Sequence, residues 1–240
     1  MPNLQDLEHK FQQELAMRRR PVAVTFLDAI PSGITAFTGS MPSGCSFWRL
    51  ASEGGAFYTV PADHFNCAVG SYTHNIPLSP EREKETEQTL GLMFQAGYIK
   101  PEEVPGIPRL AKTPAAIVYS PLGAAPVDLK NSASAVLFAC KPSGAMLLNE
   151  AAIRAGAGGA TPAMGRPTCM GLPLALERGT QISLGCIGNR TYTGLGDDEL
   201  YIIIAGKDLE RVASSLDEIV GANSALQQYA QGRRAAIATA

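Results

Sequence analysis

Cysteine is the residue type in this sequence whose number and placement most strongly suggest chemistry. Four thiolates form the ligand set of a [4Fe–4S] cluster or a structural zinc site. The gaps of 22 and 17 residues within two pairs differ from the short Cys-x-x-Cys spacing of ferredoxins and zinc ribbons. The paired arrangement therefore predicts a cysteine-ligated iron–sulfur or other metal centre with redox function, and leaves open that the thiols are simply unligated. The expected ligands are Cys45, Cys67, Cys169 and Cys186.

The stretch 62–76 supports a second interpretation, a cysteine-dependent enzyme. Cys67 could pair with His64 or His74 as thiolate and imidazole. Asp63 or Asn66 could orient the imidazole ring. The fifth cysteine, Cys140, falls in an apolar run and is expected to be a small core residue.

A third interpretation is a non-catalytic protein that binds a small anionic molecule. Guanidinium groups bind carboxylate or phosphate through two parallel hydrogen bonds, and the candidates are Arg49, Arg166 and Arg190. Aromatic side chains could line such a pocket, namely Trp48, Tyr58, Phe65, Tyr72 and Tyr192.

The two cysteine pairs lie in stretches that echo each other. Ala, Glu and Gly follow Cys45 at offsets six, eight and ten, and they follow Cys169 at the same offsets. Each stretch then has an expected strand and a second cysteine, followed by Gly and Tyr-Thr. Self-similarity of this kind predicts an internal duplication. The expected halves, 20–98 and 115–222, would pack about a pseudo-twofold axis and bring the cysteine pairs together.

Hydrophobic periodicity and turn residues predict the elements that must position these cysteines. Helices are expected over 3–18, 45–53, 79–96, 142–154, 169–178 and from 208 onward, with a frayed end after Gly232. Strands are expected over 21–27, 56–60, 115–119, 135–140, 180–184 and 200–205. The glycine-rich stretch 155–165 is expected to be a loop. Residues 1–240 should thus form one compact α/β domain, or an α+β domain, with a mixed sheet and flanking helices.

The length and net charge of the chain limit the kinds of partner that we expect. The 240 residues carry a net charge of −2, which does not favour nucleic acid or an anionic membrane as a partner. No apolar run reaches the ~20 residues that span a bilayer, and the N-terminus lacks the apolar core of a signal peptide. A cytoplasmic location is therefore expected, where thiols stay reduced. A small molecule or an electron-transfer protein is the expected partner, and a homo-oligomer is left open.

The cysteine-bearing motifs also carry a family resemblance. They are the segments Cys45 to Arg49, Asp63 to Gly70, Gly165 to Cys169, Ser183 to Leu195 and Asp197 to Tyr201. In these segments the chain resembles the domain-of-unknown-function 169 family, a prokaryotic group frequent in anaerobes and archaea. The similarity extends from about Leu4 to Tyr229. It implies a metal or redox role for the cysteines and assigns no catalytic residue.

Overall fold

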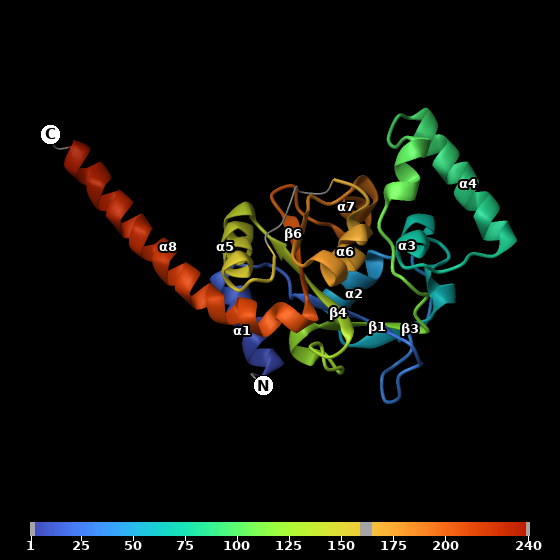
Figure 1. Ribbon diagram of the computed structural model, residues 1–240, viewed down its shortest axis with the longest axis horizontal. Coiled ribbons are helices and arrows are strands. Elements are labelled where there is room, and N and C mark those ends of the chain that lie inside the picture. Colours follow the sequence, from blue (N-terminus) through green and yellow to red (C-terminus); the bar gives the residue numbers. More distant parts are fainter. Residues whose placement is uncertain (1–2, 159–164, 239–240) are drawn as a thin grey trace.

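The computed structural model describes residues 3–158 and 165–238, in which six strands form a single sheet with helices on both faces (Figure 1). The strands are β1 (Val22–Leu27), β2 (Phe57–Thr59), β3 (Ala116–Pro121), β4 (Ala133–Cys140), β5 (Gln181–Ser183) and β6 (Leu200–Ala205). The helices are α1 (Leu4–Glu14), α2 (Ser46–Glu53), α3 (Ala68–Thr73), α4 (Pro80–Gln95), α5 (Pro142–Arg154), α6 (Gly171–Arg178), α7 (Ile187–Thr193) and α8 (Leu209–Ala238). Short 3₁₀ turns are η1 (Pro61–His64), η2 (Pro101–Gly106), η3 (Leu122–Ala124), η4 (Thr168–Met170) and η5 (Gly206–Asp208).

The α/β class with flanking helices is confirmed, and the sheet differs from the expected mixed one because its strand ladders are antiparallel. A helix between two strands usually joins parallel neighbours. Here α2 does connect β1 and β2 in the same direction, but β3 inserts between them and pairs antiparallel with both. In the same way β6 inserts between β4 and β5. The chain thus forms two split β–α–β units, which the helix–strand pattern alone does not distinguish from adjacent parallel pairs.

The strand order is symmetric about the centre of the sheet. It reads β2-β3-β1-β4-β6-β5, so that β1, β2 and β3 occupy the positions that β4, β5 and β6 occupy on the other side. The central strands β1 and β4 pair antiparallel, as a pseudo-twofold axis between them requires. This topology supports the duplication predicted from the sequence. It places the boundary between the halves after β3, so β3 belongs to the first half and not to the second.

One face of the sheet is covered by α1, α5 and α8. Alternate residues of β4 point to this side, where Phe138 meets Phe11 of α1 edge to face at a ring distance of 4.8 Å. Cys140 also lies on this side and is fully buried. Its predicted place as a core residue is therefore confirmed.

The opposite face carries α2, α6 and a group of stacked aromatic rings. Phe47 of α2 lies against Tyr119 of β3, with 5.3 Å between ring centroids. Phe57 of β2 stacks on the same tyrosine at 5.6 Å. Cys45 and Cys169 are buried in this layer. The sheet therefore separates Cys140 from the layer that contains the predicted ligands.

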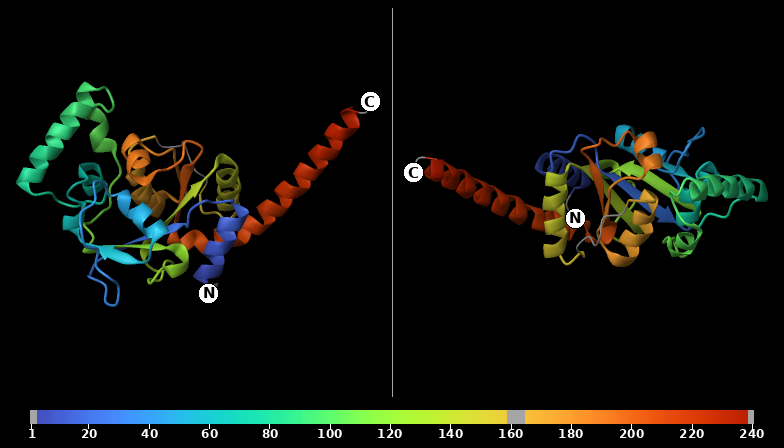
Figure 2. Two further views of the ribbon diagram at one scale, coloured as in Figure 1. Left: turned by 180° about the vertical axis from the view of Figure 1, so that it is seen from behind. Right: turned by 90° about the horizontal axis from the view of Figure 1, so that it is seen from above.

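Two helices extend away from the body at opposite ends of the molecule (Figures 1 and 2). No residue of α4 is buried, and α8 is exposed beyond about residue 221. α8 continues to Ala238, whereas the sequence predicted fraying after Gly232. Part of the expected loop 155–165 lies outside the described residues, at 159–164. No helix in the described part of the chain is long and apolar enough to cross a membrane.

Two helical glycines should respond oppositely to the same substitution. Gly144→Ala would place a Cβ 2.7 Å from the carbonyl oxygen of Leu15, where α5 packs against the end of α1. We expect unfolding free energy to fall by about 1–3 kcal/mol because the helices must separate. Gly221→Ala meets no atom within 4 Å and should leave stability unchanged or raise it by up to ~1 kcal/mol. Urea denaturation of both variants measures this, and equal effects would contradict the packing of α5 on α1.

Candidate cysteine centre

Each of the four predicted ligands lies where a helix begins. Cys45 directly precedes α2 and Cys67 caps α3. In the second half Cys169 lies in η4, directly before α6, and Cys186 precedes α7. The two halves therefore present their cysteines in equivalent positions. Neither α3 nor α7 was expected from the sequence, because both are short and carry no amphipathic repeat.

The two halves of the chain contact each other in the region of the cysteines. α2 of the first half contacts α7 of the second, and α3 of the first half contacts η4 of the second. Cys45 lies against Asn189 of α7. Cys169 lies against α3, with its Sγ 4.0 Å from the carbonyl oxygen of Val69. The two cysteine pairs are thereby brought into one region, as the duplication predicted.

The four thiols are close enough to act on one another electrostatically. Burial raises the pKa of Cys45 well above its usual range, and Cys169, Cys67 and Cys186 raise it further. Burial also raises the pKa of Cys169, with additional contributions from Cys67 and Cys186. The buried thiols of Cys45 and Cys169 would therefore stay protonated at neutral pH unless a cation were present. A thiophilic metal supplies the positive charge that such a group needs to ionise.

Cys67 accepts hydrogen bonds from the backbone. The amide of Gly70 donates to Cys67 Sγ at 3.3 Å, and this bond and one from Gly44 lower the thiol pKa. Burial outweighs them, and the pKa of Cys67 is raised overall. A Cβ on Gly70 would lie 2.9 Å from the same sulfur, so glycine permits the close approach. Amide hydrogen bonds to a ligand sulfur are one means by which proteins tune the potential of a metal cluster.

Around the thiols lies an unusual set of buried polar atoms that lack hydrogen-bond partners. Native proteins leave few such atoms, because each costs about 1–3 kcal/mol. In the described part of the chain they are Nε1 of Trp48, Nδ1 of His64, both ring nitrogens of His74, the hydroxyl of Tyr119 and the side-chain amide of Asn189. All belong to the layer that contains the cysteines. Trp48 Nε1 and the Asn189 amide nitrogen are donors, and His74 and Tyr119 each carry one proton, so the region offers several donors to an acceptor-rich, anionic guest.

The side chains of the two histidines interact with each other and, through His64, with Thr59, and not with the cysteines. His64 Nε2 lies 2.9 Å from the hydroxyl of Thr59, and its ring is 5.7 Å from that of His74. Burial and the neighbouring His74 lower the pKa of His64 to about 3, and burial lowers that of His74 to about 4. Both rings are therefore neutral at pH 7.

The geometry does not assemble the alternative nucleophile pair of Cys67 and His74. Neither ring nitrogen of His74 has a hydrogen-bond partner among the described residues, so it does not contact the Cys67 thiol. Asp63 accepts from the amide of Val60 at 2.8 Å and caps η1. Asn66 donates to the Ser40 hydroxyl at 2.7 Å. Neither residue orients an imidazole.

The three predicted anion-binding arginines lie in different surroundings. Arg190 donates to the carbonyl oxygens of Gly196 at 2.8 Å and Glu199 at 3.0 Å, and also to that of Leu184. It thus clamps the segments on both sides of α7. Arg49 forms an ion pair with Glu53 one turn along α2. Arg166 alone remains near the cysteines without a hydrogen bond to any described residue.

The predicted aromatic lining does not form one pocket. Trp48 is buried against Tyr201, with ring centroids 5.7 Å apart, whereas Tyr192 is 41% exposed. Tyr72 lies elsewhere, with its hydroxyl 3.3 Å from the carbonyl oxygen of Val104. The aromatic residue that does lie among the thiols is Tyr119. Burial, then Cys45, Cys67 and Cys169, raise its pKa.

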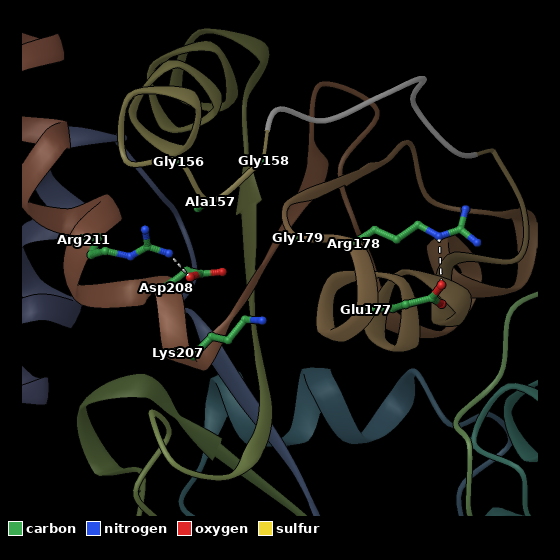
Figure 3. Close-up of a pocket in the computed structure, with 9 residues that line it drawn as sticks. All are labelled: Gly156, Ala157, Gly158, Glu177, Arg178, Gly179, Lys207, Asp208 and Arg211. Carbon is green, nitrogen blue, oxygen red and sulfur yellow. Dashed lines mark hydrogen bonds and ion pairs between the residues drawn. The ribbon is translucent and has the colours of Figure 1, made fainter.

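A separate cleft of about 480 Å³ lies away from the cysteines, between the ends of α5 and α6 and the start of α8 (Figure 3). Its charged side chains pair with one another: Asp208 with Arg211, and Glu177 with Arg178. Lys207 is the remaining charged residue of the described lining, so these two ion pairs leave the cleft with one positive charge. None of its described lining residues is a cysteine or histidine.

Sequence reasoning missed Tyr119 and Asn189. Tyr119 falls inside an apolar strand run, where an aromatic residue normally indicates core packing. Asn189 follows Cys186 by three residues, and its amide is completely buried next to a thiol. The sequence signal that could have identified Asn189 is its position, because it is a polar residue at a short distance after a cysteine.

Comparison with known proteins agrees with the motifs. A model of the domain-of-unknown-function 169 (DUF169) family, described as uncharacterised ArCR, matches residues 10–215 of the 240. The chain belongs to the DUF169 family. No curated protein and no solved structure matches it significantly. The match in this DUF169 protein includes all four candidate ligands and ends before the exposed part of α8.

The buried histidines should make the metal-free DUF169 protein sensitive to acid. Their pKa values of about 3 and about 4 are depressed, so the unfolded chain binds more protons below pH 6.5. Stability is therefore complete above pH 6.5 and falls as the pH decreases towards 4. We expect each histidine to cost about 2 kcal/mol of unfolding free energy at pH 5. Urea denaturation between pH 8 and pH 5 measures the loss.

A double variant, His64→Gln with His74→Gln, should flatten this pH dependence. His9→Gln is the matched control, because His9 lies on the exposed side of α1 and should leave the profile unchanged. An equally steep profile in the double variant would show that other groups cause the acid sensitivity.

Proposed function

We propose that this DUF169 protein is a redox protein that holds a [4Fe–4S] cluster on Cys45, Cys67, Cys169 and Cys186. The observation that carries the proposal is the convergence of four cysteines, two from each half, in one region, where Cys45 and Cys169 are buried and the other two are partly exposed. The cluster would supply one-electron transfer. The residues of this chain would bind it, shield it from water and donate hydrogen bonds to its sulfur atoms.

The unpartnered donors support an anionic guest of this kind. Trp48 can only donate, and Tyr119, Asn189 and His74 each have a proton to donate. Cluster sulfides and thiolates are acceptors, so a bound cluster would satisfy donors that are otherwise costly to bury. Unligated thiols, the alternative left open by the sequence, would leave the donors of Trp48 and His74 without partners, whereas Asn189 interacts with the Cys45 thiol and Tyr119 with the Thr59 hydroxyl.

A [4Fe–4S] cluster and a single metal ion require different separations between their thiolate ligands. Two sulfurs on one zinc ion are at most about 4.6 Å apart, because each Zn–S bond is about 2.3 Å. In the described part of the chain, no three His, Cys, Asp or Glu side chains are grouped closely enough to hold one metal ion. In a [4Fe–4S] cluster each iron takes one cysteine, so its ligands lie farther apart than those of a single ion.

Anaerobic purification tests the proposal. The protein should be brown, with a broad visible absorption band near 400 nm that bleaches with dithionite and about four irons per chain. Protein from zinc-supplemented and iron-supplemented cultures should be compared by metal analysis. A colourless protein with one zinc per chain would replace the cluster with a mononuclear site. A colourless, metal-free protein would contradict any metal centre.

A further inference from the structure

Arg166 is the anion-binding candidate whose guanidinium stays available, and it lies at the edge of the cysteine region. Thr168, two residues after it, accepts a hydrogen bond from the amide of Cys186 at 2.7 Å. Cys186 is partly exposed, unlike Cys45 and Cys169. The arginine, the threonine and the cysteine therefore lie together at the edge of the candidate centre.

Tyr98 contacts the same arginine. It belongs to the segment between α4 and η2, and its ring lies 4.8 Å from the Arg166 guanidinium carbon. Burial and the Cys186 thiol raise the pKa of Tyr98, whereas the Ile187 amide and Arg166 lower it. These interactions place the tyrosine next to both Cys186 and the arginine.

The charge of Arg166 is only weakly compensated. Its nearest carboxylate is that of Glu103, 3.9 Å away and beyond hydrogen-bond distance. The side chain is 42% exposed, so its donors face solvent close to Cys186. The ring of Tyr98 limits the positions of the guanidinium without using its hydrogen-bond donors. A planar cation held in this way is suited to two parallel hydrogen bonds from a carboxylate.

We propose that Arg166 and Tyr98 form a binding site for a small carboxylate beside Cys186. The site would bring an anionic molecule to the edge of the cysteine centre. As a substrate site for that centre it rests on the proposed function, whereas the binding itself depends only on Arg166, Tyr98 and the position of Cys186. Arg190 and Arg49 are excluded because their guanidinium groups are already used within the chain.

Alkylation of Cys186 by two reagents of similar size tests this. In each reaction the thiolate attacks the CH₂ carbon and iodide leaves, but iodoacetate carries a carboxylate and iodoacetamide is neutral. The ratio of their rates cancels the thiolate fraction. In folded, chelator-treated protein we expect the ratio at Cys186 to exceed that in urea by about threefold to tenfold. Peptide mass spectrometry measures the rates at each cysteine.

Arg166→Gln should lower the ratio to the value of the unfolded chain, and Arg166→Lys should retain part of it. Arg49→Gln is the matched control and should leave the ratio unchanged. Equal ratios in wild type and Arg166→Gln would overturn the proposal. So would failure of both reagents to react with Cys186 in the folded protein, since the site requires an accessible thiol. Both results are measured on protein from which the chelator has removed metal, so neither depends on whether the proposed cluster forms.

A second measurement uses the protein as purified. Sodium propionate should raise the melting temperature of wild type more than propionamide at equal ionic strength. Arg166→Gln should abolish the difference, and circular dichroism should confirm that it folds. An equal response of the two proteins to propionate would count against the site even if the variant folds poorly at high temperature.

Discussion

Replacement of any one of Cys45, Cys67, Cys169 or Cys186 by alanine is expected to reduce the iron of anaerobically purified protein from about four atoms per chain to less than about one. Each half of the chain supplies two ligands, and helices of the two halves contact each other in the region of the cysteines. Loss of one ligand should therefore destabilise the whole cluster instead of a quarter of it. Iron analysis and the visible spectrum of the four variants measure the effect.

Cys140→Ala is the matched control for this series. Cys140 is buried like Cys45 and Cys169, and burial raises its pKa to about 12, but it lies on the opposite face of the sheet. The Cys140→Ala variant should retain its iron. Loss of iron in Cys140→Ala, or normal iron in all four ligand variants, would contradict the assignment of the ligands.

Arg190→Ala is expected to have the largest effect on stability among the arginine variants. Its guanidinium donates to three backbone carbonyls, before and after α7, and thereby holds the segment that carries Cys186. We expect the unfolding free energy to fall by about 2–4 kcal/mol, because charged donors contribute strongly and three carbonyls lose their partner. If the cluster is present, iron retention should fall as well.

Arg49→Ala provides the comparison, since the same sequence pattern suggested both arginines. Its ion pair with Glu53 is solvent-exposed, so the change in stability should stay within about 0.5 kcal/mol. Chemical denaturation compares the two variants. Similar small effects of both would mean that Arg190 is not the structural clamp described above.

Much of the framework could be predicted from the sequence because it depends on local patterns. The strands from Val22, Ala133 and Leu200 are continuous apolar runs, and Ser79 with Pro80 marks the start of α4. The antiparallel sheet could not be predicted in this way. The insertion of β3 between β1 and β2 is a long-range pairing, and it leaves no trace in the periodicity of any one segment.

The candidate site was predictable in its ligands but not in its surroundings. The repeated offsets from Cys45 and Cys169 indicated two equivalent pairs, and the symmetric topology explains how they meet. The donors of Tyr119 and Asn189 come from a strand and a short helix, and only the folded chain brings them together. The use of Arg190 as a clamp depends on three carbonyl positions that sequence spacing does not specify.

The acid-labile sulfide content of protein purified without oxygen tests the central claim most directly. Inorganic sulfide is present in an iron–sulfur cluster and absent from both a mononuclear metal site and free thiols. A [4Fe–4S] centre on the four cysteines predicts about four sulfides per chain, equal to the iron content. Well-folded protein with no sulfide, whatever its metal content, would contradict the account.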